Sequence, residues 1–226
     1  MKQEHNQVGF SSSGVRIQLL SVIAASADVT SFLCFHDVFT SAMTGNLALI
    51  GIAASQGRLL GSHALLALPA FALGAIFAGA VQGESPRSAN RVLALETLFL
   101  ALYVAMWWTW GFVPPTEAGI DGMILCSALA MGAQSVLSRQ IDVAGVPSVV
   151  FTNTLTSIVL GAVQASKQKA ALSRPTRQQF AALMAYAAGA LLFAWLLQAS
   201  PLLAVNLPLA LLMLVWYLAR HEKTGP

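Results

Sequence analysis

Asp28 is the side chain whose transfer into lipid costs the most free energy in the apolar part of this sequence. It lies about twelve residues into the first apolar segment. An ionisable group at that depth costs about 2.5–3.5 kcal/mol on membrane-insertion scales, and the short aspartate stem does not reach the interface. We therefore expect Asp28 to face a cavity or a polar partner, or to carry a proton. Two interpretations remain open: a proton or cation site, and a structural hydrogen bond to a hydroxyl such as that of Thr44 or Thr152.

A polar stretch, VFTSAMTGN at residues 38–46, follows Asp28, and a related stretch, VFTNTLTSI, occupies residues 150–158. Non-helical backbone at membrane depth is tolerated only where it is buried in protein or lines water. The first stretch predicts a helix that begins inside the membrane, capped by Thr40 or Ser41, with free N–H groups facing a cavity. Such a helix start attracts anionic groups. The alternative is that these small polar residues only hold helices together.

The candidate substrate- or ion-binding residues come from these two stretches and from polar residues within the apolar segments. They are Asp28, Thr40, Thr44, Gly45, Asn46, Gln134, Thr152, Asn153, Thr154 and Glu96. Glu96 is only five residues into its segment, so it is also close enough to reach the interface. The sequence shows no catalytic or metal-binding motif and implies no cofactor.

Composition places most of the chain in lipid. Of the 226 residues, 57% are hydrophobic and only 9% are charged, against roughly 25% charged in a soluble domain. Eight apolar segments of spanning length follow one another, and they predict an all-α polytopic membrane bundle. They run over 16–35, 38–55, 63–82, 92–113, 119–136, 148–165, 179–198 and 201–219.

The eight segments form two similar sets of four. Short patterns recur in the same order, pairing Asp28 with Gln134, Gly74 with Gly189, Glu96 with Asn206, and the first polar stretch with the second. We interpret residues 1–226 as a single transmembrane domain with repeat 1 at 16–113, repeat 2 at 119–219, and polar tails at 1–15 and 220–226. Gly74, Gly79 and Gly189 are expected to be helix-packing positions.

Charge counting distinguishes two topologies, both with the N-terminus inside. If all eight segments cross, nine Lys or Arg residues lie inside and three outside. If the second and sixth segments dip in and return on the same side, eleven lie inside and only Arg58 lies outside. The positive-inside rule favours six spans plus two re-entrant segments. Both termini are then cytoplasmic, and the two halves are inverted relative to each other.

The chain resembles a known family along nearly its whole length. Asp28, VFTSAMTGN, FALGA (71–75) and LALE (93–96) resemble the YoaK-like family of bacterial multi-spanning membrane proteins of unassigned function. MGAQS (131–135) and TNTLTS (152–157) resemble that family's second-half stretches, with Ser135 where Asn is usual and Asn153 where Gly is usual. The resemblance implies an integral membrane protein with about six spans, and it supplies no substrate.

Three function classes compete. The leading hypothesis is a small secondary transporter of an unknown solute, in the plasma or inner membrane, with its site between the repeats. The alternative is a non-transporting scaffold or sensor, and a homo-oligomer is possible in either case. An enzyme would have to use His36, Asp37, His63 and Glu96, whose spacing matches no catalytic motif. The basic residues cluster between apolar segments, which indicates membrane topology rather than nucleic-acid binding.

Overall fold

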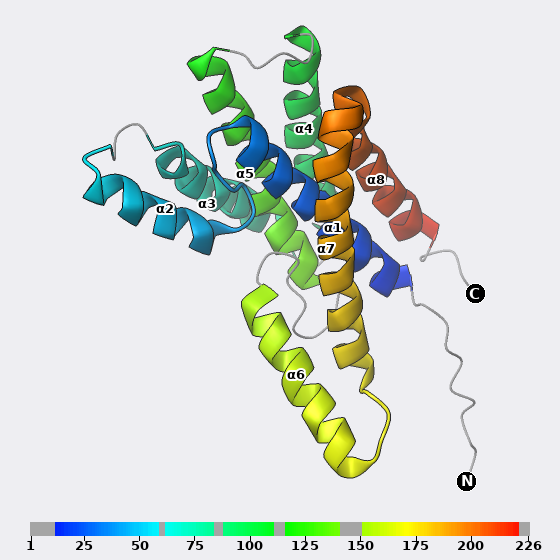
Figure 1. Ribbon diagram of the computed structural model, residues 1–226. Helices are drawn as coiled ribbons and strands as arrows, with labels where there is room; N and C mark the ends of the chain where they lie inside the picture. The colour runs from blue at the N-terminus through cyan, green and yellow to red at the C-terminus, as the bar shows by residue number, and fades with distance from the viewer. Residues whose placement is uncertain (1–11, 59–61, 84–87, 111–115, 141–150, 222–226) are drawn as a thin grey trace.

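The computed structural model describes residues 12–58, 62–83, 88–110, 116–140 and 151–221, and within these ranges all regular structure is helical (Figure 1). The helices are α1 (Ser12–Cys34), α2 (Met43–Ser55), α3 (Ala64–Val81), α4 (Ser88–Thr109), α5 (Glu117–Gln140), α6 (Phe151–Gln168), α7 (Arg174–Ala199) and α8 (Pro201–His221). Each expected apolar segment corresponds to one helix. The predicted all-α fold class is therefore confirmed.

Six of these helices are long and apolar enough to cross a membrane: α1, α3, α4, α5, α7 and α8. The second and sixth segments became α2 and α6, which are not among them. α2 has only 13 residues, and at 1.5 Å per residue it is about 20 Å long, too short for a bilayer core of about 30 Å. The described helices therefore match six spans plus two accessory helices.

The first helices of the two halves, α1 and α5, form the centre of the bundle. Their apolar windows are 61% and 67% buried, against 22–39% for the other four candidate spans. α7 packs along α1, while α3 and α4 pack along α5. α6 lies beside the first turns of α7 at the foot of the bundle in Figure 1, and α2 lies across α3.

Glycines set the closest helix crossing, between α3 and α5. A Cβ atom at Gly74 would lie 2.2 Å from the carbonyl oxygen of Leu129, and one at Gly132 would lie 2.1 Å from that of Phe71. These backbones touch directly, as small residues permit in membrane helices. The prediction for Gly79 is wrong, because a Cβ atom built there meets no atom of the described chain within 4 Å.

Gly189 provides the corresponding contact between α7 and α1. A Cβ atom at Gly189 would lie 3.2 Å from both Ala25 and Val22. The packing role predicted for Gly74 and Gly189 is therefore confirmed. Together the two glycine contacts hold α3 and α7 against the two central helices.

Candidate functional site

The Asp28 carboxylate is 2% exposed and lies at the centre of a dense set of hydrogen bonds. Its Oδ1 atom accepts from the backbone N–H groups of Thr40, Ser41 and Ala42, at 3.1, 2.7 and 3.3 Å. Its Oδ2 atom accepts from the Ser41 hydroxyl at 2.6 Å and from the Tyr186 hydroxyl at 2.8 Å. Backbone N–H groups only donate and an ionised carboxylate only accepts, so this geometry suits the charged form.

The chain turns back into the bundle to make these contacts. Asp28 lies six residues before the end of α1, which is about 9 Å along the helix axis. Residues 38–42 must return by that distance before α2 begins at Met43. The chain is therefore discontinuous between α1 and α2, and the protein's own carboxylate binds the N–H groups just before α2. That α2 begins inside the membrane stays a prediction.

The predicted helix cap is wrong. The N-cap residue of α2 is Ala42, and no side chain caps the helix. The Ser41 hydroxyl donates to Asp28 instead, and the Thr40 hydroxyl lies 2.9 Å from the Ser127 hydroxyl. The strong acceptor on α1 competes for these groups, since a hydrogen bond to a charged group is worth about twice a neutral one.

Asn46 fixes the shape of the polar stretch from the first turns of α2. Its side-chain oxygen accepts from the Phe39 N–H at 3.0 Å, and its side-chain nitrogen donates to the Phe39 carbonyl at 2.6 Å. Gly45 is required beside this clamp, because a Cβ atom there would lie 2.9 Å from the Phe39 ring. Both residues therefore position the loop that holds Asp28.

The cluster joins the two halves of the chain. We name Asp28, Thr40, Ser41, Ser127 and Tyr186 the Asp28 cluster. Ser127 lies on α5 and Tyr186 on α7, while the other three residues come from the first half. The bonds to Ser127 and Tyr186 span 87 and 158 residues of sequence.

A small cavity lies beside the Asp28 cluster, between Ser127 and α4. It measures about 10 Å³ and is lined by Ser127, Ser26, Thr30, Tyr103 and Leu100, among others. A space of that size has room for about one water molecule. The hydroxyl groups around it give a water molecule several hydrogen-bond partners.

Glu96 occupies the same face of α4, one helical turn before Leu100. It is 0% exposed, and neither carboxyl oxygen has a hydrogen-bond partner among the described residues. The prediction that Glu96 reaches the interface is therefore wrong. A buried carboxyl group without partners costs free energy, and no contact of Glu96 among the described residues offsets that cost.

The remaining candidates lie elsewhere. Gln134 is buried on α5 and donates to the Leu20 carbonyl at 2.9 Å, eight residues and about 12 Å along α1 from Asp28. Thr44 is exposed. Thr154 is 1% exposed on α6, and the side chains of Thr152 and Asn153 lie outside the described residues.

Sequence reasoning missed the two members of the cluster that come from the second half. Tyr186 lies three residues before Gly189 on α7, and it contributes a hydroxyl within an apolar helix. Ser127 is a single hydroxyl between Cys126 and Ala128. A lone hydroxyl in such a segment does not reveal its partner, because Ser often bonds its own helix.

Comparisons with known proteins agree with this architecture. Residues 17–218 match a family described as a protein of unknown function, DUF1275. The chain is 30% identical over 187 residues to the UPF0700 transmembrane protein YoaK of Bacillus subtilis (strain 168), covering 79% of this chain and 81% of the relative. No solved structure gave a significant match. The YoaK-like resemblance is confirmed, and the chain is a multi-pass membrane protein.

Proposed function

The chain belongs to the DUF1275 family of proteins of unknown function, and from that premise we propose that it is a small secondary transporter. Its coupling site is the Asp28 cluster, where the two halves meet. The proposal assigns no enzymatic reaction and no cofactor to the chain. The solute is a small molecule of undefined class.

The observation that carries the proposal is that one buried carboxylate holds together α1, α7 and the loop before α2. Ionisable residues inside a membrane bundle are expensive and mark ion or proton pathways. Three of the five bonds to Asp28 come from backbone N–H groups, which cannot accept, so a proton on the carboxyl group must sit on Oδ2 and be accepted by the Ser41 or Tyr186 hydroxyl. Protonation also removes the negative charge and therefore weakens the bonds from the backbone of residues 40–42.

Weaker bonds between Asp28 and the loop before α2 would couple proton binding to a movement of that loop. Residues 38–42 have few helical hydrogen bonds of their own and depend on Asp28 and Asn46 for their position. When Asp28 carries a proton, the loop is held less tightly to α1, while the contact at Gly189 keeps α7 packed against α1. A transporter needs such a two-state element whose equilibrium its coupling ion biases.

The helix packing supports an internal repeat, which alternating access of this kind would use. Exchanging α1–α4 with α5–α8 maps the principal packed pairs of the described bundle onto one another. The exchange turns α1–α7 into α3–α5 and α1–α8 into α4–α5. It likewise turns α2–α3 into α6–α7 and α3–α4 into α7–α8. The pairs α1–α5 and α4–α8 are unchanged by it. His36, just after α1, lies 3.5 Å from Glu117 at the start of α5, which supports opposite directions for these helices.

The test is solute-driven proton movement in proteoliposomes that carry a trapped pH-sensitive dye. Amino acids, organic acids, amines and sugars are applied one at a time to wild-type protein, and we expect at least one to drive a pH change. Asp28→Asn should abolish that change. Asp37→Asn is the matched control, because it makes the same chemical change at an exposed aspartate and should retain wild-type flux.

Tyr186→Phe provides a milder variant that removes one donor from the carboxylate. We expect altered coupling with the fold retained, because loss of one hydrogen bond to a charged group costs about 1.5–3 kcal/mol. Coupled flux that survives Asp28→Asn unchanged would remove Asp28 from the mechanism.

A non-transporting scaffold or sensor is the second candidate, favoured by how completely the protein itself satisfies Asp28. Its carboxylate bonds to the chain through both oxygens while only 2% exposed. In that case Asp28→Asn lowers stability without changing any flux, and no solute in the panel moves protons through folded wild-type protein.

A further inference from the structure

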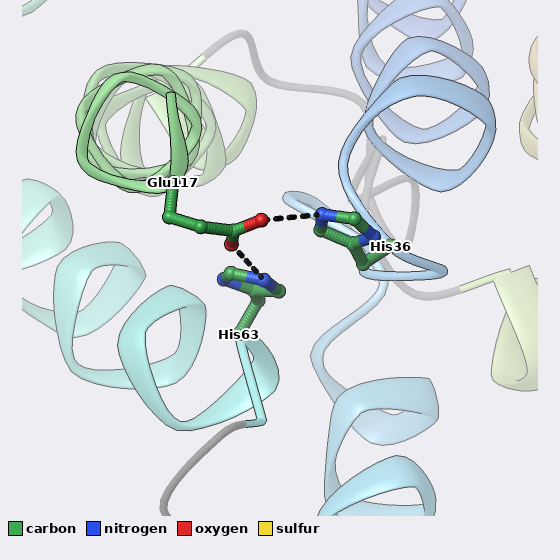
Figure 2. A group of neighbouring side chains, drawn as sticks. All are labelled: His36, His63 and Glu117. Carbon is green, nitrogen blue, oxygen red and sulfur yellow. Dashed lines mark ion pairs between the residues drawn. The ribbon is translucent and has the colours of Figure 1, made fainter. Parts of the chain in front are cut away.

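Two histidines and one glutamate converge at one end of the bundle, away from the Asp28 cluster (Figure 2). His36 follows the last turn of α1, His63 is the N-cap residue of α3, and Glu117 opens α5. One ligand atom from each residue lies within 4.8 Å of the others. Figure 2 shows both imidazole rings directed at the same carboxylate.

The two histidine–glutamate separations are too long for direct hydrogen bonds and close to the distance between ligands of one metal ion, and each histidine faces a different carboxylate oxygen. Nε2 of His36 lies 3.5 Å from Oε1 of Glu117, and Nε2 of His63 lies 3.6 Å from Oε2. A direct N–H···O bond measures about 2.7–3.2 Å. Ligand atoms around tetrahedral zinc, with bonds of about 2.0–2.1 Å, are about 3.3–3.5 Å apart.

A fourth residue orients one of the histidines. Nδ1 of His63 lies 3.0 Å from a carboxylate oxygen of Asp121, one turn into α5. When Nδ1–H donates to Asp121, the lone pair of Nε2 faces Glu117, another acceptor. A cation between Nε2 and Glu117 resolves that conflict. This carboxylate–histidine arrangement is common behind metal-binding imidazoles.

The backbone before the site is held in an uncommon conformation. His36 and Asp37 have φ values of 59° and 60°, in the left-handed region that non-glycine residues rarely enter. The turn brings the His36 ring against the His63 ring, with centroids 5.0 Å apart and planes 13° apart. A local turn and a distant helix start thus bring the two rings together, and because they are stacked nearly parallel, one ring must rotate before both Nε2 atoms point at one ion.

Solvent reaches the cluster through a recess of about 760 Å³ that His36, His63 and Glu117 help to line. The Glu117 side chain is 74% exposed, whereas that of His63 is 15% exposed. Asp37 lines the same recess, and Arg58 is the described basic side chain on its wall. A cation from solution thus has a path to a partly preformed site.

We propose that His36, His63 and Glu117 bind one divalent transition-metal ion of the zinc class, with Asp121 orienting His63. Two imidazoles and one carboxylate suit Zn²⁺ and its neighbours, whereas Mg²⁺ and Ca²⁺ prefer oxygen ligands. Three protein ligands leave one position for water or another ligand. The ion would join α1 and α3 of the first half to α5 of the second, whether or not the protein transports a solute.

The direct test is calorimetric titration of ZnCl₂ into purified full-length protein without a histidine tag, in lipid nanodiscs. We expect one ion per chain, with no heat from MgCl₂ at the same concentration. His36→Gln, His63→Gln and Glu117→Gln should each weaken binding more than about 100-fold, since loss of an outer-shell partner alone costs about 10–100-fold. Asp121→Asn should fall within that outer-shell range.

His221→Gln is the matched control, because His221 lies at the end of α8 beside Tyr217, and it should bind Zn²⁺ as wild type does. A second measurement needs no variant: zinc-edge X-ray absorption of the wild-type complex should show two imidazole nitrogens. Absence of saturable Zn²⁺ binding would overturn the proposal and leave the three residues as a polar cluster without a metal ion. Binding that survives all three ligand substitutions would overturn it as well.

Discussion

Asp28 and Glu96 are both buried carboxyl groups within candidate spans, and their surroundings are opposite. Asp28 accepts bonds through both oxygens, from the loop before α2 and from α7. Glu96 has no hydrogen-bond partner among the described residues. A satisfied carboxylate stabilises the arrangement around it, whereas a buried carboxyl group without partners costs free energy, and such groups inside membrane bundles often mark proton pathways. Glu96 is thus the second residue to test for a part in proton movement.

We predict that Glu96→Met raises the free energy of unfolding by about 1–3 kcal/mol, because it removes an unpartnered buried polar group while keeping similar volume. Thermal unfolding in one detergent measures this change. Glu96→Gln is the matched control, because it keeps a polar group of the same size at the same buried position and should gain less than Glu96→Met. Lower stability of Glu96→Met than of wild type would show that Glu96 makes a stabilising contact.

At the scale of helices, the α3–α5 crossing depends on backbone contact at Gly74 and Gly132. A Cβ atom added at either glycine would lie 2.1–2.2 Å from a carbonyl oxygen of the facing helix. That is far inside van der Waals contact, and the obstacle is backbone rather than a movable side chain. The two helices must therefore separate to admit even one methyl group.

We predict that Gly74→Ala and Gly132→Ala each lower the free energy of unfolding by about 1–3 kcal/mol or more, as overpacking does. Gly79→Ala is the matched control on α3, because its Cβ atom meets open space. That control should be neutral or gain up to about 1 kcal/mol from helix propensity. Equal unfolding temperatures for all three variants would contradict the contact.

For the whole molecule, the first turn of α1 and the last turn of α8 lie toward the same end of the bundle in Figure 1. His36, His63 and Glu117 mark the opposite end. The charge count places Arg58 alone outside, and Arg58 lines the recess at that opposite end. The expected orientation therefore has cytoplasmic termini and an external metal-binding cluster.

Cysteine labelling in intact cells tests this orientation. In a background with Cys34 and Cys126 replaced by Ala, Gln56→Cys should react with a membrane-impermeant maleimide added outside. Ser166→Cys, in the last turns of α6, should react only after the membrane is opened. Labelling of Gln56→Cys only after opening would contradict the inverted six-span topology.

The sequence by itself determined the membrane class, the approximate limits of the described helices, and the need of Asp28 for polar partners. These features follow from local composition. The runs of apolar residues are long enough to span lipid, and one short charged side chain lies too deep in its segment to reach the interface. The polar stretch at 38–46 was also interpretable as a discontinuous helix start, because its residue types are local. The first residue of α2, Met43, lies five residues later than the apolar pattern indicated.

Only the tertiary structure decided which groups meet. Asp28 accepts from Tyr186, 158 residues away, whereas Thr44, one of the expected partners, is exposed. Glu117 joins two histidines that lie 27 residues apart in the sequence. A hydrogen bond or metal ligand set depends on positions to within a few tenths of an ångström, which the packing of distant helices fixes. Residue types and spacing along one helix do not contain that information.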